Sequence, residues 1–348
     1  MRRKVMTKKI PDYWKSSLSD ADNEVMNIKK GTVDEFTSAG GRKIYRIFYG
    51  EKNLFRRTAN LSSAVGAKNK DYFADKKSRS YRPTLLLIGC QHGFEFEGSV
   101  ALLNIIHAIE TGNDYAGNPH NYIKEFLDKI NLIIIPYNNP DGRSRVPYET
   151  ADGLSFEEFR YYDQGTWSDG TLTGWPGCKE LHPMVGDRVG FLGAYFNDDG
   201  INIVHDLFPF PTAKETKLLF DTVYDYVPDL TIMLHGGTNS NPSILYPEAV
   251  HKMYADKSEK FAKLTIDRMA RKGFKLNYHS LDDSTADSLP NYNIASAMTN
   301  ACGEPCVVFE SNQGLDYRGT RLTMDEIYAE HIILFEAALE YTAACRND

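Results

Sequence analysis

The stretch that decides the fold is Leu85-Leu86-Leu87-Ile88-Gly89-Cys90-Gln91-His92-Gly93-Phe94-Glu95. Its apolar beginning predicts a buried strand. The residues from Phe96 to Ile109 behind it have apolar side chains at helical spacing. His92 and Glu95 therefore lie on a loop between a strand and a helix, at the sheet edge where open α/β folds bind ligands. A histidine and a carboxylate at that place can both bind one metal ion.

Two later apolar runs also end in residues that carry chemistry. The run Leu230–Leu234 is followed by His235, and the run Pro305–Phe309 is followed by Glu310. Parallel strands bring their carboxyl ends to one sheet edge, so these side chains are expected near the first pair. Two histidines and one carboxylate form a typical catalytic zinc set with an open position for water. Glu310 arrives separately, which makes it the natural general base and acid.

Another buried strand is predicted at Asn131–Pro136, followed by the turn sequence Asn138–Gly142. Arg143 and Arg145 come directly after this turn. Surface charge is the simplest interpretation of both arginines. An arginine fixed by a rigid turn at this sheet edge could instead hold an anionic group.

The order of these motifs resembles the zinc carboxypeptidase family over about residues 80 to 345. The chain resembles an atypical bacterial-type member of that family. It also resembles the aspartoacylase and succinylglutamate desuccinylase branch. The resemblance rests on His92-x-x-Glu95, Asn139-Pro140-Asp141-Gly142, Gly200-Ile201-Asn202-Ile203, His235 and Glu310.

The resemblance implies an α/β fold with a mixed, mostly parallel, twisted eight-stranded sheet and helices on both faces, as in phosphorylase/hydrolase-like proteins. It also implies one zinc ion per chain. Carried over, the zinc ligands are His92, Glu95 and His235, and the general base and acid is Glu310.

The sequence departs from the family where an Asn-Arg pair normally grips the terminal carboxylate of the substrate. Val204 and His205 stand at those positions. Valine cannot bind a carboxylate, and histidine is a weaker, pH-dependent partner than arginine unless a neighbour such as Asp206 keeps it protonated. Removal of an ordinary C-terminal residue is therefore not the expected activity.

Other substrate-binding residues follow from the same resemblance. Arg143, Arg145 and Arg160 are candidates for the arginine that stabilises the oxyanion, and Arg145 is favoured because the turn fixes its position best. Tyr292 is the near candidate for the family's phenolic tyrosine. Arg145 is therefore expected to act in catalysis with Glu310, and the expected substrate-binding residues are Arg143, Asn202, His205 and Tyr292.

The domain organisation is expected to be one catalytic domain over residues 1–348, with an N-terminal extension and early strands in 1–80 and the core in 80–345. Residues 147–199 look like a long, irregular, aromatic-rich insertion, which is typical of a functional loop. After it, Thr212 and Glu215 predict a capping box at the start of a helix.

Composition restricts the class of protein. The net charge of −7 argues against a dedicated nucleic-acid-binding protein, and no apolar run reaches membrane-spanning length. Five irregularly spaced cysteines favour a reducing compartment, and no secretory signal is visible, so a cytoplasmic location is expected. The sequence does not determine the oligomeric state.

The leading functional hypothesis is a zinc hydrolase of the carboxypeptidase type, which cuts a peptide or amide with altered specificity. The first alternative is an N-acyl amino acid deacylase of the aspartoacylase/desuccinylase type, which is favoured slightly by Gly93 after the histidine. The second alternative is a non-catalytic binding module. The presence of Glu310 argues against this last hypothesis.

Overall fold

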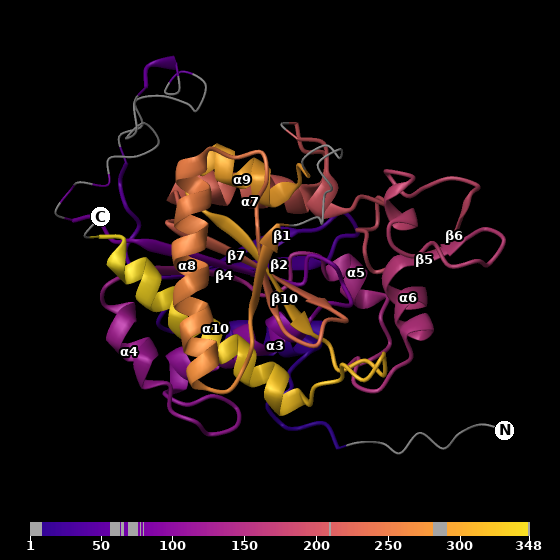
Figure 1. Ribbon diagram of the computed structural model, residues 1–348, viewed down its shortest axis with the longest axis horizontal. Helices are drawn as coiled ribbons and strands as arrows, with labels where there is room; N and C mark the ends of the chain where they lie inside the picture. The colour runs from indigo at the N-terminus through magenta and orange to yellow at the C-terminus, as the bar shows by residue number, and fades with distance from the viewer. Residues whose placement is uncertain are drawn as a thin grey trace.

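The centre of the molecule is a mixed eight-stranded sheet (Figure 1). The computed structural model describes residues 9–55, 63, 66–68, 76, 78, 80–208, 210–280 and 291–346. The strand order is β1-β2-β4-β3-β7-β10-β8-β9. The strands are β1 (Thr32–Thr37), β2 (Lys43–Tyr49), β3 (Thr84–Gly89), β4 (Asn131–Ile135), β7 (Leu230–Gly237), β8 (Ser243–Tyr246), β9 (Asn277–Ser280) and β10 (Cys306–Asn312).

Four neighbouring pairs in this sheet are parallel: β4–β3, β3–β7, β7–β10 and β8–β9. The pairs β1–β2, β2–β4 and β10–β8 are antiparallel. The expectation of a mixed, mostly parallel sheet of eight strands is confirmed. The four central strands are parallel, so their carboxyl ends meet at one edge.

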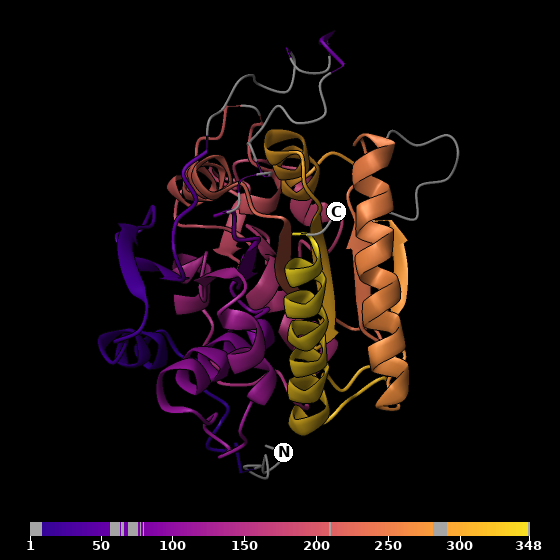
Figure 2. The ribbon, with the colours of Figure 1, turned by 90° about the vertical axis from the view of Figure 1, so that its left-hand side faces the viewer.

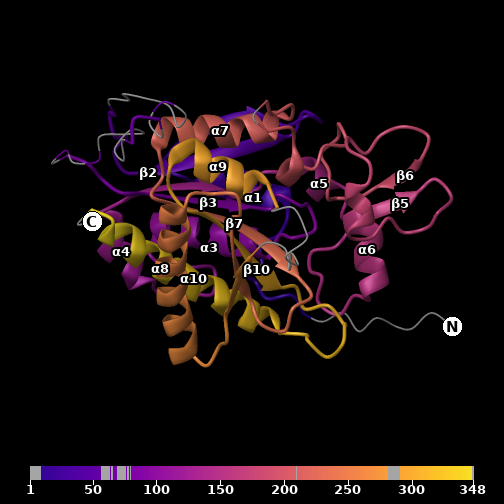
Figure 3. The same cartoon turned by 45° about the horizontal axis from the view of Figure 1, so that its top comes forward.

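Helices cover both faces of the sheet, as expected. One face carries α3, α8 and α10, and α8 lies beside α10 (Figure 2). The other face carries α7 and α9, which pack against each other (Figure 3). The helix bounds are α1 (Leu18–Met26), α3 (Glu97–Thr111), α4 (Asn121–Leu127), α5 (Pro140–Ser144), α6 (Phe156–Gln164), α7 (Lys214–Tyr226), α8 (Lys252–Arg271), α9 (Ile294–Cys302) and α10 (Met324–Ala344).

The central strands are continuously apolar because both of their faces are buried. In β3, Leu85 and Leu87 belong to the core on the α3 side, whereas Leu86 and Ile88 belong to the core on the α7 side. Alternate side chains of a strand point to opposite faces, so one apolar run supplies two cores. At roughly 25 cal/mol per Å² of apolar surface, this burial is the main stabilising contribution to the fold.

The aromatic-rich insertion contains regular structure, so the expectation of an irregular stretch is wrong in part. It holds α6, the two-stranded sheet of β5 (Gly165–Trp167) and β6 (Val189–Leu192), and the 3₁₀ turn η1 (Gly177–Lys179). Its aromatic rings reach the loop that carries His92 and Glu95. Phe94 on that loop stacks with Tyr148 at 6.0 Å and contacts Phe159 at 5.2 Å between ring centroids.

The predicted capping box at α7 is also wrong. Ala213 occupies the N-cap position, and Thr212 donates to the Asp206 carboxylate. Glu215 is buried, and it accepts hydrogen bonds from Ala39 N and from the Asn197 side chain. Tertiary contacts therefore outcompete the local capping pattern.

The remaining chain-wide expectations concern the cysteines and the membrane. All five cysteines are unpaired, and Cys302 and Cys306 are buried. None of the helices in the described part of the chain combines the length and apolarity that crossing a bilayer requires. The basic opening of the chain, Arg2 to Lys4, lies outside the described residues.

Candidate active site

The loop after β3 carries the first pair of site residues. Cys90 takes a left-handed backbone conformation with φ +50°, which turns the chain at the end of the strand. At Gly93, an added Cβ would lie 2.1 Å from the Gly142 carbonyl carbon, so only glycine allows α5 to approach this closely. The turn and this contact fix His92 and Glu95, which are both buried at the sheet edge.

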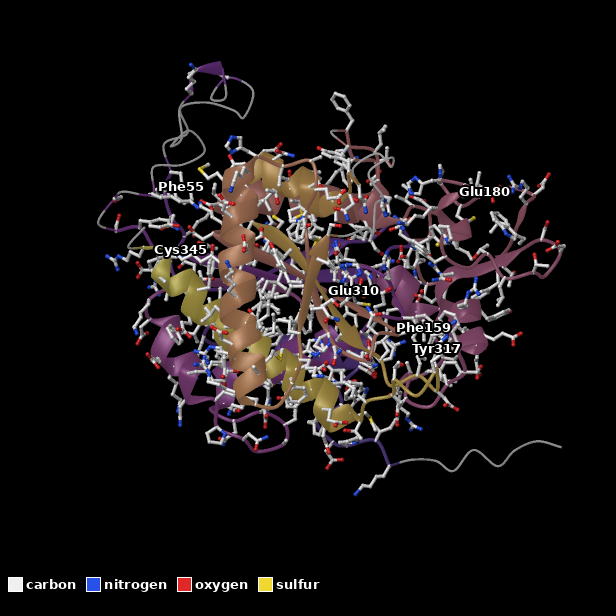
Figure 4. All side chains as sticks on the ribbon, viewed as in Figure 1. Phe55, Phe159, Glu180, Glu310, Tyr317 and Cys345 are labelled. Atoms are coloured by element: carbon white, nitrogen blue, oxygen red, sulfur yellow. The ribbon has the colours of Figure 1, made fainter. Side chains whose placement is uncertain are left out.

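His235 and Glu310 lie on neighbouring strands of the same edge. β7 and β10 are parallel, and the Cα atoms of His235 and Glu310 are directly paired in the register. The third strand end is close because Gly89 of β3 pairs with Leu234, the residue before His235. Figure 4 shows Glu310 at the side of the sheet that faces the insertion with Phe159.

The three residues expected to bind zinc form one cluster. Glu95 Oε1 is 2.9 Å from His92 Nδ1, and Glu95 Oε2 is 2.7 Å from His235 Nδ1. One potential ligand atom from each residue lies within 4.8 Å of the other two, and all three residues are buried. Two imidazole nitrogens and one carboxylate are the donor set of a catalytic zinc site. The residues present therefore fit the metal.

The far nitrogen of each histidine is held by a side-chain amide. His92 Nε2 donates to Asn202 Oδ1 at 3.3 Å, and His235 Nε2 donates to Gln91 Oε1 at 2.9 Å. A proton on each Nε2 satisfies these bonds and would leave each Nδ1 available to a metal ion. Tyr195 stacks on the His92 ring with 3.5 Å between centroids and further fixes its orientation.

The two glutamates of the site, Glu95 and Glu310, have shifted pKa values. Burial alone would raise the pKa of Glu95, but the neighbouring His92 and His235 lower it below its ordinary value. Burial, and then the negative charge of Glu95, raise the pKa of Glu310. The pKa values of the two carboxyl groups therefore shift in opposite directions: Glu95 stays ionised, and Glu310 holds a proton more readily. This separation is typical of an acid/base residue beside a charged ligand residue.

The expected oxyanion arginines are held by other protein groups. The Arg143 guanidinium is buried and donates to the carbonyl oxygens of Ser16, Val146 and Tyr148. Arg145 donates to the Asp198 carboxylate and to the carbonyl oxygens of Gly193 and Phe196. In the described part of the chain these bonds tie loops together, so neither guanidinium is free to bind a substrate group.

Arg160, the remaining arginine candidate, lies on α6. Its guanidinium carbon is 5.6 Å from the centre of the Phe156 ring. It also approaches Gly174 so closely that a Cβ there would overlap it. Its side chain is therefore packed within the insertion.

The expected carboxylate-binding positions are placed beside the cluster but are uncharged. Val204 and His205 belong to the 3₁₀ turn η2 (Ile203–His205), whose start is capped by the Asn202 side chain. Burial, and then the cationic Lys179, lower the pKa of His205 to about 3. Asp206 accepts hydrogen bonds from Leu207, Thr212 and Ala213 instead of pairing with the imidazole. His205 is therefore neutral at pH 7.

Asn202 and Tyr292 are the two other expected substrate residues. Asn202 uses its side-chain oxygen to hold His92, as described above, so it orients a ligand residue. Tyr292 is 48% exposed, and its ring lies edge-on to Phe208 with 6.4 Å between centroids. The segment before it, residues 281–290, lies outside the described residues.

Sequence reasoning missed Gln91, Tyr195 and Asp163. Gln91 directly precedes His92 in the sequence. A side-chain amide next to a candidate ligand histidine was a signal that could have identified Gln91. Asp163 at the end of α6 is 1% exposed, and neither of its carboxylate oxygens has a hydrogen-bond partner among the described residues. Burial, and then the charges of Glu95 and Glu310, raise its pKa. No local pattern in the insertion predicts that Asp163 lies near the site.

Comparison with known proteins agrees with this geometry. Residues 32–156 match the zinc carboxypeptidase family model. No curated protein sequence gives a significant match. The fold is similar to the metallo-carboxypeptidase from Burkholderia cenocepacia, with 12% identity, a TM-score of 0.54 and coverage of 93% of this chain and 67% of that chain.

Two animal proteins have the same fold. Carboxypeptidase A from Helicoverpa armigera is 15% identical with a TM-score of 0.53, and the alignment covers 97% of this chain and 76% of that chain. Bovine thrombin-activatable fibrinolysis inhibitor is 12% identical with a TM-score of 0.53, and the alignment covers 95% of this chain and 98% of that chain. Residues 32–156 thus resemble the zinc carboxypeptidase family, and the chain as a whole shares the fold of the metallocarboxypeptidases.

Proposed function

We propose that the chain is a zinc-dependent hydrolase that cleaves a peptide or amide bond in a substrate lacking an ordinary free C-terminal residue. The observation that carries this proposal is the His92–Glu95–His235 cluster with Glu310 paired beside His235 on the next strand. His92, Glu95 and His235 would hold one zinc ion through two Nδ1 atoms and a carboxylate oxygen.

Zinc, when bound, would lower the pKa of a water molecule and polarise the scissile carbonyl. Glu310 takes the proton from the attacking water and returns it to the leaving nitrogen, and its raised pKa suits both steps. Asn202 and Gln91 keep the two histidines in the productive tautomer. The proposal gives no oxyanion role to Arg143 or Arg145, because protein groups already bind both guanidinium groups.

The proposed substrate class rests on two residues next to the cluster. Val204 is apolar and His205 is neutral at pH 7, so the pair lacks the permanent charge that grips a carboxylate. We infer a peptide or acylated amino acid with a modified or polar group at this position. The proposed location is the cytoplasm.

The test combines metal analysis of the purified protein with a hydrolysis panel of blocked dipeptides, cell-wall-type peptides and acylated amino acids. The expected result is about one zinc per chain and zinc-dependent cleavage of a member of the last two groups, with Glu310→Gln as the background control. Metal-loaded protein that cleaves nothing on the panel, or that cleaves equally with Glu310→Gln, would contradict the proposal.

The deacylase alternative loses the sequence feature that favoured it. Gly93 is required by the close approach of Gly142, whatever bond the enzyme cleaves. A non-catalytic module has no need of a carboxyl group paired beside His235.

A further inference from the structure

The hydroxyl group of Tyr195 is an unpaired hydrogen-bond donor beside the candidate zinc site. Tyr195 is 8% exposed, and its hydroxyl has no hydrogen-bond partner among the described residues. The carboxylate oxygens of Asp163 also lack partners but are shut off from solvent, whereas the Tyr195 hydroxyl keeps contact with solvent. A mostly buried tyrosine usually finds a partner for its hydroxyl within the protein, so this free donor is available to a ligand.

The backbone of Tyr195 is fixed against the loop that carries His92. The carbonyl oxygen of Ala194 accepts a hydrogen bond from Gly93 N at 2.7 Å, and Tyr195 N donates to the carbonyl oxygen of Asp163 at 2.7 Å. The first bond ties the insertion to the loop after β3, and the second ties Tyr195 to the end of α6. The tyrosine is therefore held in place without any use of its hydroxyl.

The side chain of Tyr195 covers one face of the His92 ring. The two ring centroids are 3.5 Å apart, and the ring planes are 14° from parallel. A phenol oxygen lies in the plane of its ring, so the hydroxyl stays within one ring width of His92. After burial, the negative charge of Glu95 does most to raise the pKa of this hydroxyl, and the charge of Glu310 also reaches it. Because Coulomb effects fall with distance, the hydroxyl lies near the Glu95 carboxylate.

Hydrolysis at this site needs a donor that the candidate arginines do not supply. Attack of water on a carbonyl group moves an electron pair onto the carbonyl oxygen, and a fixed donor stabilises the charge that develops there. Protein groups already bind Arg143 and Arg145, and Arg160 is packed within the insertion. The phenol of Tyr195 is protonated at neutral pH and can donate one hydrogen bond.

We propose that Tyr195 is a catalytic residue, whose hydroxyl donates a hydrogen bond to the carbonyl oxygen of the scissile bond in the transition state. This inference rests on the proposed hydrolytic function. The water oxygen forms a bond to the carbonyl carbon while Glu310 takes the proton, and the electron pair of the C=O double bond moves to the oxygen that Tyr195 binds. When the double bond forms again, the C–N bond breaks, and Glu310 returns the proton to the nitrogen. Tyr195 keeps its own proton throughout.

The experiment is steady-state kinetics of Tyr195→Phe in the zinc-loaded, full-length protein, on the panel substrate that the wild type cleaves fastest. The variant keeps the ring on His92, and the lost hydroxyl leaves no protein group without its partner. We expect kcat to fall by about 10²–10³-fold, the usual effect of removing one oxyanion donor, and KM to change by less than about 3-fold. Zinc affinity, measured by competition with a chromophoric chelator, should equal that of the wild type.

The matched control is Tyr161→Phe on α6, the same change at a tyrosine that is 39% exposed and stacks on Phe191. It should leave kcat and KM unchanged. A normal kcat in Tyr195→Phe would overturn the role of Tyr195 and leave the proposed hydrolysis intact. A lower kcat together with weaker zinc binding would also overturn it, since the tyrosine would then act only through His92. Absence of zinc-dependent cleavage by the wild type would contradict the proposed function itself, and this role with it.

Discussion

Glu310 lies directly beside His235, with paired Cα atoms on two adjacent parallel strands. Residues in such register point to the same face of a sheet, so the carboxyl group and the imidazole share one side of the edge. The pairing gives each of them a separate expected role and allows each role to be tested by a single substitution.

His235→Ala is expected to lose zinc while the fold survives. The side chain supplies one of three clustered ligand atoms, but the apolar residues of β7 that pack in the two cores remain. Metal content is measured after dialysis, and circular dichroism checks the fold. The control is His279→Ala on β9, an exposed histidine that lies outside the cluster. Full metal content in His235→Ala would show that the ligand assignment is wrong.

Glu310→Gln is expected to keep zinc and to lose hydrolysis by about 10²–10⁴-fold in kcat, the usual contribution of a general acid/base. The amide has the shape of the carboxyl group but cannot take a proton from water. Glu35→Gln, an exposed change on β1, should leave turnover unaffected. Near-normal turnover of Glu310→Gln with bound metal would mean that another group transfers the proton.

The strands and the zinc-ligand candidates could be predicted because their signals are local. Apolar runs buried on both faces mark β3, β7 and β10, and each run ends just before or within the site. The insertion could not be predicted in the same way. Asp163 is buried there without any local sign of it. Outside the insertion, Arg145 and Asn202 take their roles from contacts with residues far away in sequence. The short strands β8 and β9 lack an apolar run long enough to distinguish them from loops.

Gln91→Leu and Asn202→Leu are each expected to weaken zinc binding by about 10–100-fold, the usual effect of removing the partner of a ligand histidine. Each substitution removes the acceptor that holds one histidine Nε2–H. Competition with a chromophoric chelator measures the zinc Kd without any activity assay. Asn300→Ala on α9, away from the cluster, serves as the control. Unchanged Kd values in both leucine variants would show that the amides do not orient the ligands.

Glu330→Gln is expected to remove a pH dependence of stability. Burial, and then Glu326, raise the pKa of Glu330 to about 8 in the folded protein, from an ordinary value of 4.5. A raised folded-state pKa means that the protonated carboxyl group stabilises the fold below about pH 4.5, and this contribution is lost as the pH rises through 8. Urea unfolding from pH 5 to 9 should show a smaller decline for Glu330→Gln than for the wild type or Glu336→Gln. Parallel declines would mean that Glu330 ionises normally in the fold.

The effect of Val204 and His205 on specificity can be tested by adding a charge beside the cluster. His205 is neutral at pH 7 and Val204 is apolar, so the wild type should cleave blocked dipeptides with a free aromatic or aliphatic C-terminus poorly. His205→Arg adds a permanent cation that can bind a carboxylate through two hydrogen bonds, and it should raise kcat/KM on these dipeptides by about 10-fold or more. His205→Ala removes the imidazole without adding charge, so it should not raise kcat/KM on these dipeptides. Efficient cleavage of simple dipeptides by the wild type would show that a different cation already grips the carboxylate, and the inferred substrate class would then be wrong.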